Sequence, residues 1–448
     1  MLAMESPPRP RLRVLISGAG IAGPALALWL SRINPSVLEC DITIVERSQK
    51  LRASGHQIDL RDQGIPIMKK MGLEEAVRAR LVREPGLQLL NRKGKVRAYL
   101  EANTSGKGSQ GFTSEYEIMR GDLCEILYQA TKDAPHVRYI FGCSVESFTQ
   151  DEARGTVRVR FSGSGGGEGV PKGEKEFDLL VGADGVGSRI RHAMLGGGDA
   201  GKDAFKPINY PAALFTVPAQ DGDTLAATML HLPGRRLIMT RKDQPDSVRV
   251  FMGFVGKDPE LDEVLKSGTM AEKKQMWVSK FTDDAETTWQ LPRYLGALLN
   301  SPMADDLYTL AMGQVKMDTW SKGRVVLLGD AGYCASPVSG LGVTISFAGA
   351  YVLGGEIARA CGNSATPAAN IPIALAAYER ELRPFIKDAQ VLPPGYPGFM
   401  VPASKWGIKV LHSIAWLITT TKIHRLAMMF ASEKKGGWKV PEYKEFET

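Results

Sequence analysis

Cysteine and histidine are scarce in this sequence, and neither residue type is grouped. The five cysteines include no Cys-x-x-Cys pair, and the six histidines include no pair two or four positions apart. A disulfide framework, a structural zinc site and a dithiol redox centre each need such grouping. The sequence therefore predicts no metal site and no cysteine-based redox chemistry.

Long apolar runs and blocks of like charge are also missing. The start, MLAMESPPRPRLR, lacks the apolar core of a signal peptide, and the run 410–421 is shorter than the roughly 20 residues of a spanning helix. Lysine and arginine are scattered, although the net charge is +7, and no nucleic-acid-binding signature occurs. We expect a cytoplasmic monomer with no nucleic-acid partner.

The C-terminal segment 403–432 is apolar but is interrupted by charges and a histidine. We expect it to form an amphipathic helix that packs on the body of the protein. Contact with a membrane surface is the alternative, and association with a membrane is not the favoured outcome.

The chain is long enough, at 448 residues, for two or three domains. A pattern of strand, glycine turn and helix opens the sequence and recurs at 177–194. Residues 207–256 are predicted to form four strands with alternating apolar and polar residues, and residues 260–313 are predicted to be helical. This order predicts an α/β (α+β) fold. A Rossmann-like domain carries an inserted antiparallel-sheet domain and a C-terminal helix.

The first glycine turn, GAGIAG, has the dinucleotide-binding spacing. Gly18 permits the tight turn, Gly20 lets the backbone approach a pyrophosphate, and Gly23 lets the helix pack closely on the strand. Glu46 ends the next strand, where its carboxylate can accept hydrogen bonds from ribose hydroxyls. A turn without a ligand is the alternative, but the flanking strand and helix favour a dinucleotide site.

Two later glycine turns lack the complete fingerprint. GADGVGS contains Asp184, and GDAG contains Asp330 at the end of an apolar strand, followed by a nearly uncharged helix. One complete fingerprint with two further turns favours one large cofactor that is contacted at several points. The alternative for Asp330 is an ordinary helix N-cap.

The motifs GAGIAG…VER, DLLVGADGVGSRIR and GRVVLLGDAGYCASPVSGLGV occur in the order found in a known family. Over residues 12–390 the chain resembles the FAD-dependent class A monooxygenases with the para-hydroxybenzoate hydroxylase fold. GHQIDLRDQGIPIMKKMGL and YEIMRGDLCEIL are similar to the subgroup with tetracycline-inactivating and fungal natural-product enzymes.

The resemblance assigns roles to individual residues. Ser188 and Arg191 complete the motif around Asp184, which is associated with both FAD and NAD(P)H, and Leu341 makes the wall beside the flavin apolar. The implied cofactor-binding residues are Gly18, Gly20, Gly23, Glu46, Arg47, Arg120, Asp184, Asp330, Pro337, Gly340, Gly342 and Val343.

The resemblance also implies how the domains divide. The FAD-binding domain is expected to comprise 11–80, 120–200 and 314–395, and the substrate domain 81–119 and 201–313. Residues 396–448 are expected to form the C-terminal helical segment.

The implied reaction is a monooxygenation through a flavin C4a-hydroperoxide. NADPH or NADH supplies the hydride, O2 supplies the oxygen, and the Met-containing apolar sheet suits a bulky aromatic, polyketide, indole-type or other polycyclic substrate. A flavin oxidase or dehydrogenase on the same fold is the alternative. A flavin-binding protein without catalytic activity is a third reading.

The catalytic candidates are Asp59, near the flavin, and Arg236, which could polarise the flavin O4 region or a substrate carbonyl. Each could instead be a solvated surface residue, and Arg235 could exchange roles with Arg236. His56 is a minor candidate for a covalent flavin attachment.

Overall fold

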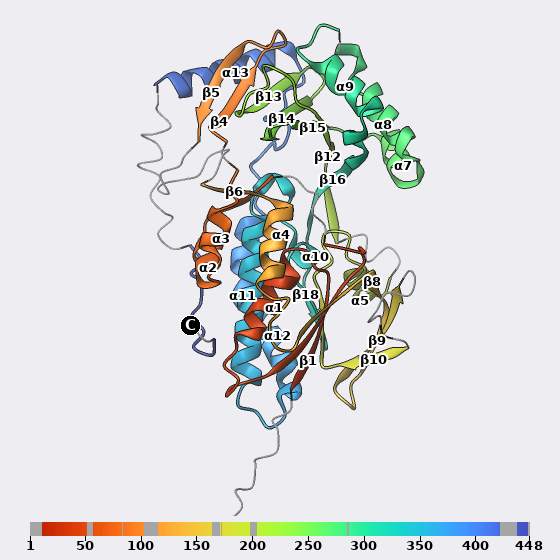
Figure 1. Ribbon diagram of the computed structural model, residues 1–448, viewed down its shortest axis with the longest axis vertical. Coiled ribbons are helices and arrows are strands. Elements are labelled where there is room, and N and C mark those ends of the chain that lie inside the picture. The colour runs from red at the N-terminus through yellow and green to blue at the C-terminus, as the bar shows by residue number, and fades with distance from the viewer. Residues whose placement is uncertain are drawn as a thin grey trace, which may run out of the picture.

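The computed structural model describes residues 11–51, 57–82, 84–102, 115–163, 171, 173–197, 204–284, 286–421 and 437–446. The molecule is elongated, with a helix-rich α/β body at one end and a large sheet with its own helices at the other (Figure 1). This mixture of helices and sheets confirms the expected fold class.

The body is built on a six-stranded sheet in the order β17-β18-β11-β1-β2-β7, parallel except for the pair β17–β18. Its strands are almost continuous apolar runs because both faces are covered. Val14 and Ile16 pack toward the helices, and Leu15 packs toward a second sheet. The strands are β1 (Leu12–Ser17), β2 (Cys40–Glu46), β7 (Val137–Phe141), β11 (Leu179–Gly182), β17 (Ser321–Lys322) and β18 (Val325–Leu327).

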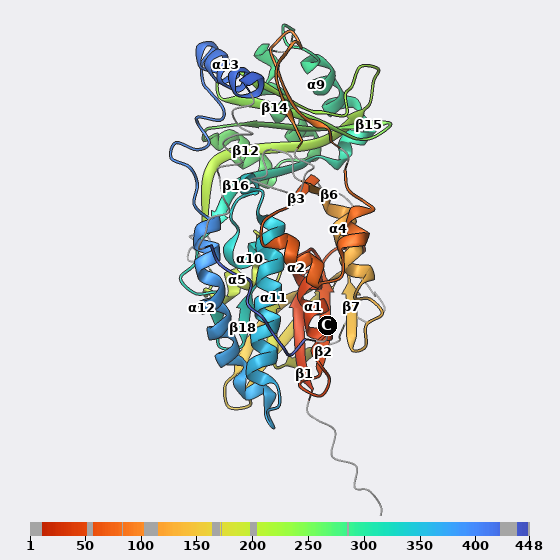
Figure 2. The ribbon, with the colours of Figure 1, turned by 90° about the vertical axis from the view of Figure 1, so that its left-hand side faces the viewer.

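Helices cover one face of this sheet, as Figure 2 shows, and a three-stranded antiparallel sheet covers the other. The helices are α1 (Ala22–Ser31), α2 (Gly64–Lys70), α3 (Glu74–Arg78), α4 (Arg120–Gln129), α11 (Gly342–Cys361) and α12 (Ile371–Ala389). The second sheet contains β8 (Cys143–Asp151), β9 (Thr156–Gly163) and β10 (Glu174–Phe177). Short helices α5 (Arg189–Met194) and α10 (Asp330–Tyr333) follow β11 and β18.

A seven-stranded sheet in the order β16-β12-β15-β14-β13-β4-β5 forms the other end of the molecule. The sequence predicted it as antiparallel, but β4 pairs with β13 in parallel because the chain enters this sheet twice. The expectation of helices over the whole of 260–313 is also wrong at its end, where β16 forms the sheet edge. The strands are β4 (Gly86–Leu90), β5 (Val96–Glu101), β12 (Phe205–Pro218), β13 (Ala227–Leu232), β14 (Arg236–Gln244), β15 (Ser247–Phe254) and β16 (Tyr308–Val315).

The two faces of the seven-stranded sheet have different partners. Alternation along β14 places Ile238 on the face covered by α7 (Pro259–Ser267), α8 (Met270–Ser279) and α9 (Leu291–Asn300), and Leu237 on the opposite face. Between the body and this sheet lies the small antiparallel pair β3 (Gln57–Leu60) and β6 (Tyr116–Met119). The 3-10 helices are η1 (Thr282–Asp284), η2 (Pro302–Asp306), η3 (Pro337–Ser339) and η4 (Pro367–Asn370).

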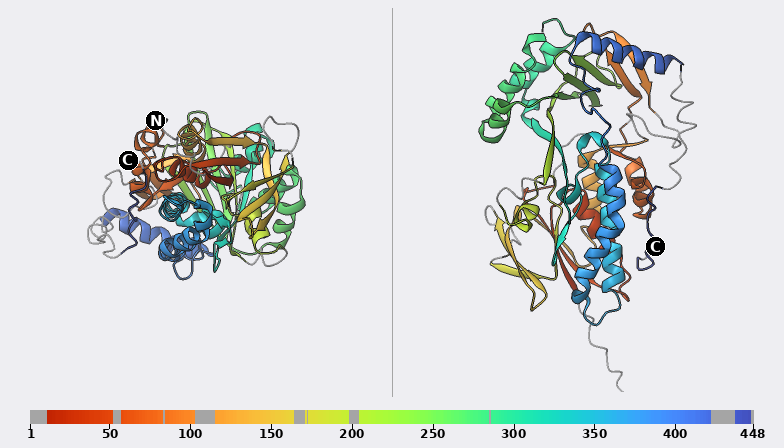
Figure 3. Two further views of the ribbon diagram at one scale, coloured as in Figure 1. Left: turned by 90° about the horizontal axis from the view of Figure 1, so that it is seen from below. Right: turned by 180° about the vertical axis from the view of Figure 1, so that it is seen from behind.

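The C-terminal helix α13 (Lys405–Thr421) lies over β5 and β13, at the end of the molecule remote from the six-stranded sheet (Figure 3). Its contact with the sheet includes a buried pair of histidines. Nδ1 of His231 in β13 lies 3.2 Å from Nε2 of His412 in α13, and Nε2 of His231 lies 3.1 Å from the carbonyl oxygen of Met400. Among the described residues, no helix is long and apolar enough to cross a membrane.

The histidine pair predicts a loss of stability in acid. Burial, followed by the neighbouring His412, lowers the pKa of His231 to about 4, and burial followed by Arg97 lowers the pKa of His412. The unfolded chain therefore binds more protons as the pH falls from 6.5 toward 4. We expect His231 alone to reduce the free energy of unfolding by about 3 kcal/mol across that window.

Urea unfolding at a series of pH values measures this effect. His231→Gln should flatten the pH dependence between pH 6.5 and 4. An equal slope in the two proteins would contradict the assignment.

Candidate cofactor and substrate site

The three glycine turns meet at one edge of the six-stranded sheet. Ser17 pairs with Gly182, and Gly182 pairs with Leu327, so the parallel strands β1, β11 and β18 end side by side. Gly18 adopts a φ of 116°, and a Cβ there would overlap the carbonyl oxygen of Ala183. The second turn therefore lies directly against the first, as a cofactor that contacts both would require.

A cation and an anion face each other across this edge. A Cβ on Gly20 would lie 3.5 Å from Nη2 of Arg120, at the start of α4. Asp330 is the first residue of α10. Burial raises the pKa of its carboxyl group, and a hydrogen bond with Cys334 and the charge of Arg120 oppose that rise. Gly329 holds the N-cap position, so Asp330 is not the ordinary N-cap considered from the sequence.

Glu46 lies at the end of β2, beside the first glycine turn. Its carboxylate accepts hydrogen bonds from the backbone N–H groups of Ala19, at 3.0 Å, and Ser48, at 2.9 Å. A carboxylate has further lone pairs, so Glu46 can still accept hydrogen bonds from ribose hydroxyls. Arg47 is exposed immediately after it.

Asp184 acts within its own turn. It accepts hydrogen bonds from the Ser188 hydroxyl, at 2.5 Å, and from the backbone N–H of Arg189, at 2.8 Å, and so caps the start of α5. The buried Arg191 donates to the carbonyl oxygens of Val186, at 2.6 Å, and Ala331, at 2.8 Å. Arg191 thus ties the second glycine turn to the third, a connection that the motif alone did not indicate.

The loop before α11 lies against β3. Pro337 opens η3, and Gly340 follows it with a φ of 66°. Gly340 lies close to Asp59, because a Cβ on Gly340 would be 3.4 Å from Oδ2 of Asp59. Thr344 fixes this approach by donating to the carbonyl of Arg61, at 2.8 Å, and accepting from its N–H. Gly342 and the buried Val343 begin α11.

A network of charged side chains lies between β3, β6 and the seven-stranded sheet. Asp59 pairs with Arg61, at 2.9 Å, and stands opposite Glu117 in the β3–β6 register. Arg241 of β14 forms ion pairs with Glu117 and, at 3.5 Å, with Glu84. Three carboxylates thus share two guanidinium groups.

Burial raises the pKa values of both Glu84 and Glu117. Arg241 opposes the rise in Glu117, while Glu84 and Asp59 add to it. The network is therefore suited to retain a proton that an exposed carboxyl would lose.

Arg236 does not join this network. It shares the helix-covered face of the sheet with Ile238, and its guanidinium donates to the carbonyl oxygens of Pro233 and Lys280, at 2.9 Å each. Arg241 shares the opposite face with Leu237 and contacts Glu117, whereas Arg236 does not. Alternation along β14 could have separated the two arginines, but not indicated which of the two faces the helices cover. His56 lies outside the described residues.

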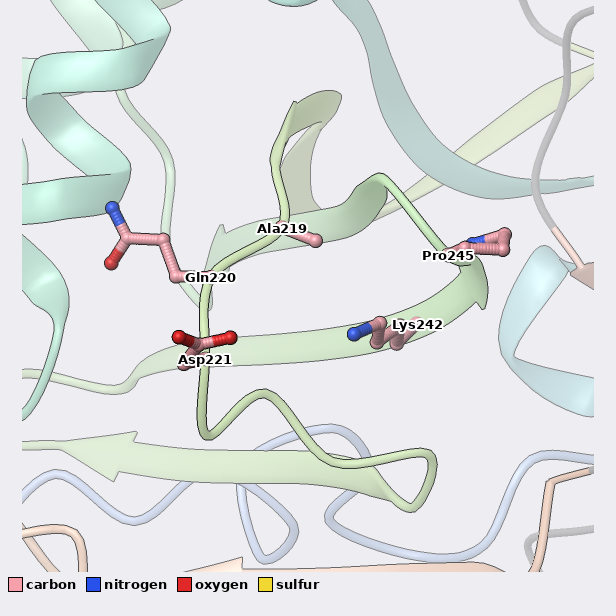
Figure 4. Close-up of a pocket in the computed structure, with 5 residues that line it drawn as sticks. All are labelled: Ala219, Gln220, Asp221, Lys242 and Pro245. Atoms are coloured by element: carbon pink, nitrogen blue, oxygen red, sulfur yellow. The ribbon is translucent and has the colours of Figure 1, made fainter.

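An open hollow on the seven-stranded sheet is lined by residues other than these. It is lined by Ala219, Gln220, Asp221, Lys242 and Pro245, beside the turn between β14 and β15 (Figure 4). None of the candidate residues lines it, so it plays no part in the site.

The residues at the sheet edge fit the FAD that the resemblance implied. A Cβ on Gly342 would meet nothing within 4 Å, and one on Gly20 would meet only the Arg120 guanidinium, so both backbones face open space. Beside Gly340, Oδ1 of Asp59 and Nε of Arg61 are buried without a hydrogen-bond partner. Buried polar atoms of this kind require a partner, which a bound polar ring would supply.

Comparison with known proteins agrees with this geometry. Residues 11–390 match the model of a family described as an FAD binding domain. The chain is 40% identical to the flavin-dependent monooxygenase eupH of Phoma sp, over 90% of this chain and 91% of that protein. It is 37% identical to the FAD-dependent monooxygenase asL4 of Sarocladium schorii, over 97% and 99% of the two chains.

Solved structures give the same result. The tetracycline destructase Tet(51) superposes with a TM-score of 0.69 at 26% identity, over 97% of this chain and all of that one. Tet(55) superposes with a TM-score of 0.70 at 25% identity, over 97% and 99% of the chains.

Proposed function

Since the chain belongs to the FAD binding domain family and is an FAD-dependent monooxygenase of class A, we propose that it uses NADPH or NADH and O2 to oxygenate a bulky aromatic or polycyclic compound. The observation that carries this proposal is the meeting of three glycine turns beside an apolar sheet face. We place the reaction in the cytoplasm.

The residues at the sheet edge hold the cofactor. Gly20 and Arg120 bind the pyrophosphate, because an exposed backbone N–H and a guanidinium both favour a dianionic group. Glu46 and Asp330 accept hydrogen bonds from the hydroxyls of the ribose and the ribityl chain. The N-terminus of α11, at Gly342, would stabilise negative charge on a flavin ring bound beside it.

When bound, FAD accepts a hydride from the nicotinamide and activates O2 for transfer to carbon. The chain's own contribution is to position the substrate and to exclude water. Arg241 presents a fixed cation from the sheet, held by Glu117 and Glu84, toward the flavin edge or a substrate carbonyl. Arg61 positions Asp59 against the loop at Gly340.

The part of the sheet face opposite the α7–α9 helices that α13 leaves free supports an apolar substrate. Its side chains are mainly aliphatic, aromatic and thioether groups, which suit a polycyclic aromatic or polyketide framework better than a sugar. They include Tyr210, Leu237, Met239, Phe251 and Met312.

Oxygen labelling distinguishes this proposal from an oxidase or dehydrogenase. The FAD-loaded protein would be incubated with NADPH or NADH, isotopically labelled O2 and a panel of polycyclic phenols and indoles. We expect the product to contain one labelled oxygen atom for each nicotinamide consumed. Reduction of the flavin by the substrate itself, without oxygen and nicotinamide, would instead establish the oxidase or dehydrogenase reaction.

A further inference from the structure

The outer face of α13 is a continuous apolar stripe. Trp406, Val410, Ile414 and Leu417 recur at spacings of four, four and three, which places them on one side of a helix. Trp406 is 75% exposed and Leu417 is 55% exposed. Figures 1 and 3 show α13 as an outer layer over β4 and β5. The exposure of its four side chains places the stripe on the outer side of this layer.

The inner face of α13 accounts for the packing that the sequence predicted. His412 is buried against the sheet, and Ala415 packs on the apolar cluster that contains Leu87 and Met229. One face of the helix is therefore used by the fold, and the large apolar side chains of the stripe are not needed for it. Exposing several such side chains together is costly for a protein surface unless something covers them.

The charges on α13 itself and on the segment before it are of one sign. No aspartate or glutamate occurs in the sequence between Asp388 and Glu433, and Lys405 and Lys409 lie on the exposed side of α13. The half-exposed Trp416 follows Lys409 by seven residues, so both lie along the same edge of the stripe. Tryptophan and lysine beside an apolar face are the side chains that suit the boundary between lipid headgroups and acyl chains.

We propose that α13 docks on an anionic lipid surface, lying in its plane with Trp406, Ile414 and Leu417 inserted and the two lysines at the headgroups. A second copy of this chain fits less well, because a self-complementary contact would bring the lysines of two helices toward each other. An anionic membrane satisfies both the apolar stripe and the positive charge.

Vesicle sedimentation of the full-length, FAD-loaded protein tests the proposal. We expect binding to vesicles of phosphatidylcholine with phosphatidylserine, and much weaker binding to phosphatidylcholine alone. Leu417→Ser should weaken binding about tenfold through lost apolar burial. Lys405→Gln and Lys409→Gln should each weaken it about fivefold, and added salt should have the same effect.

The matched control is Ile373→Ser at the start of α12, since Ile373 is also exposed, at 63%, but lies on the body of the protein. It should bind vesicles as the parent does, and the melting temperature of each variant should confirm that it folds. The proposal is overturned if no vesicle binds. It is also overturned if Leu417→Ser leaves vesicle binding unchanged, or if light scattering shows a dimer that Leu417→Ser dissociates.

Discussion

Gly18→Ala is expected to weaken FAD binding by about two orders of magnitude. The backbone at Gly18 has a φ of 116°, which a side chain makes costly, and the new Cβ would overlap the carbonyl oxygen of Ala183. Strain of this kind costs about 1–3 kcal/mol, and the shift needed to relieve it would displace the pyrophosphate loop. Titration of the apoprotein with FAD, followed by flavin fluorescence, measures the loss.

Gly187→Ala is the matched control for this substitution. Gly187 lies in the second glycine turn, but a Cβ there would meet nothing within 4 Å, and its φ is not in the left-handed region. We expect it to bind FAD within about twofold of the parent, since ordinary surface substitutions cost little. Equal binding by the two variants would show that the first turn does not hold the cofactor.

Arg241→Ala is expected to lower kcat by at least about 100-fold, the usual effect of removing one fixed cation or donor from a reacting centre. It should also lower the free energy of unfolding by about 3–5 kcal/mol, because Glu84 and Glu117 are almost fully buried and would lose their shared partner. Thermal melting of the FAD-loaded protein and steady-state turnover measure the two effects separately.

Two further variants separate catalysis from folding at this position. Arg241→Lys keeps the charge and should restore most of the melting temperature, but only part of kcat, since an ammonium group cannot reproduce the guanidinium geometry. Arg236→Ala removes an arginine that donates to backbone carbonyls on the helix-covered face, and should retain turnover within about threefold. If Arg236→Ala were the more damaging of the two alanine variants for turnover, the role given to Arg241 would be wrong.

The meeting of the three glycine turns at one sheet edge could be predicted from the sequence because its signals are local. A strand, a glycine turn and a helix follow one another within some twenty residues around Gly18, and parallel strands end at a common edge. The position of Asp330 at the end of an apolar strand could be predicted by the same logic, and its role at the cofactor stays a prediction. The close approach of Gly340 to Asp59 depends on tertiary packing, which no local pattern specifies.

The substrate side could not be predicted to the same depth. Arg236 and Arg241 both lie in the alternating pattern of β14, and only the placement of α7–α9 decides which of the two lies on the helix-covered face. Glu84 and Glu117 are separated from Arg241 by more than a hundred residues. The parallel pairing of β4 with β13 likewise depends on where the chain re-enters the sheet.

A crystal structure of the FAD-loaded protein tests the central claim most directly. The account predicts one FAD per chain, with its pyrophosphate at Gly20 and Arg120 and its ring between Gly342 and the Asp59–Arg61 pair. Density for the flavin ring away from Gly342, or for the pyrophosphate away from Gly20, would contradict it.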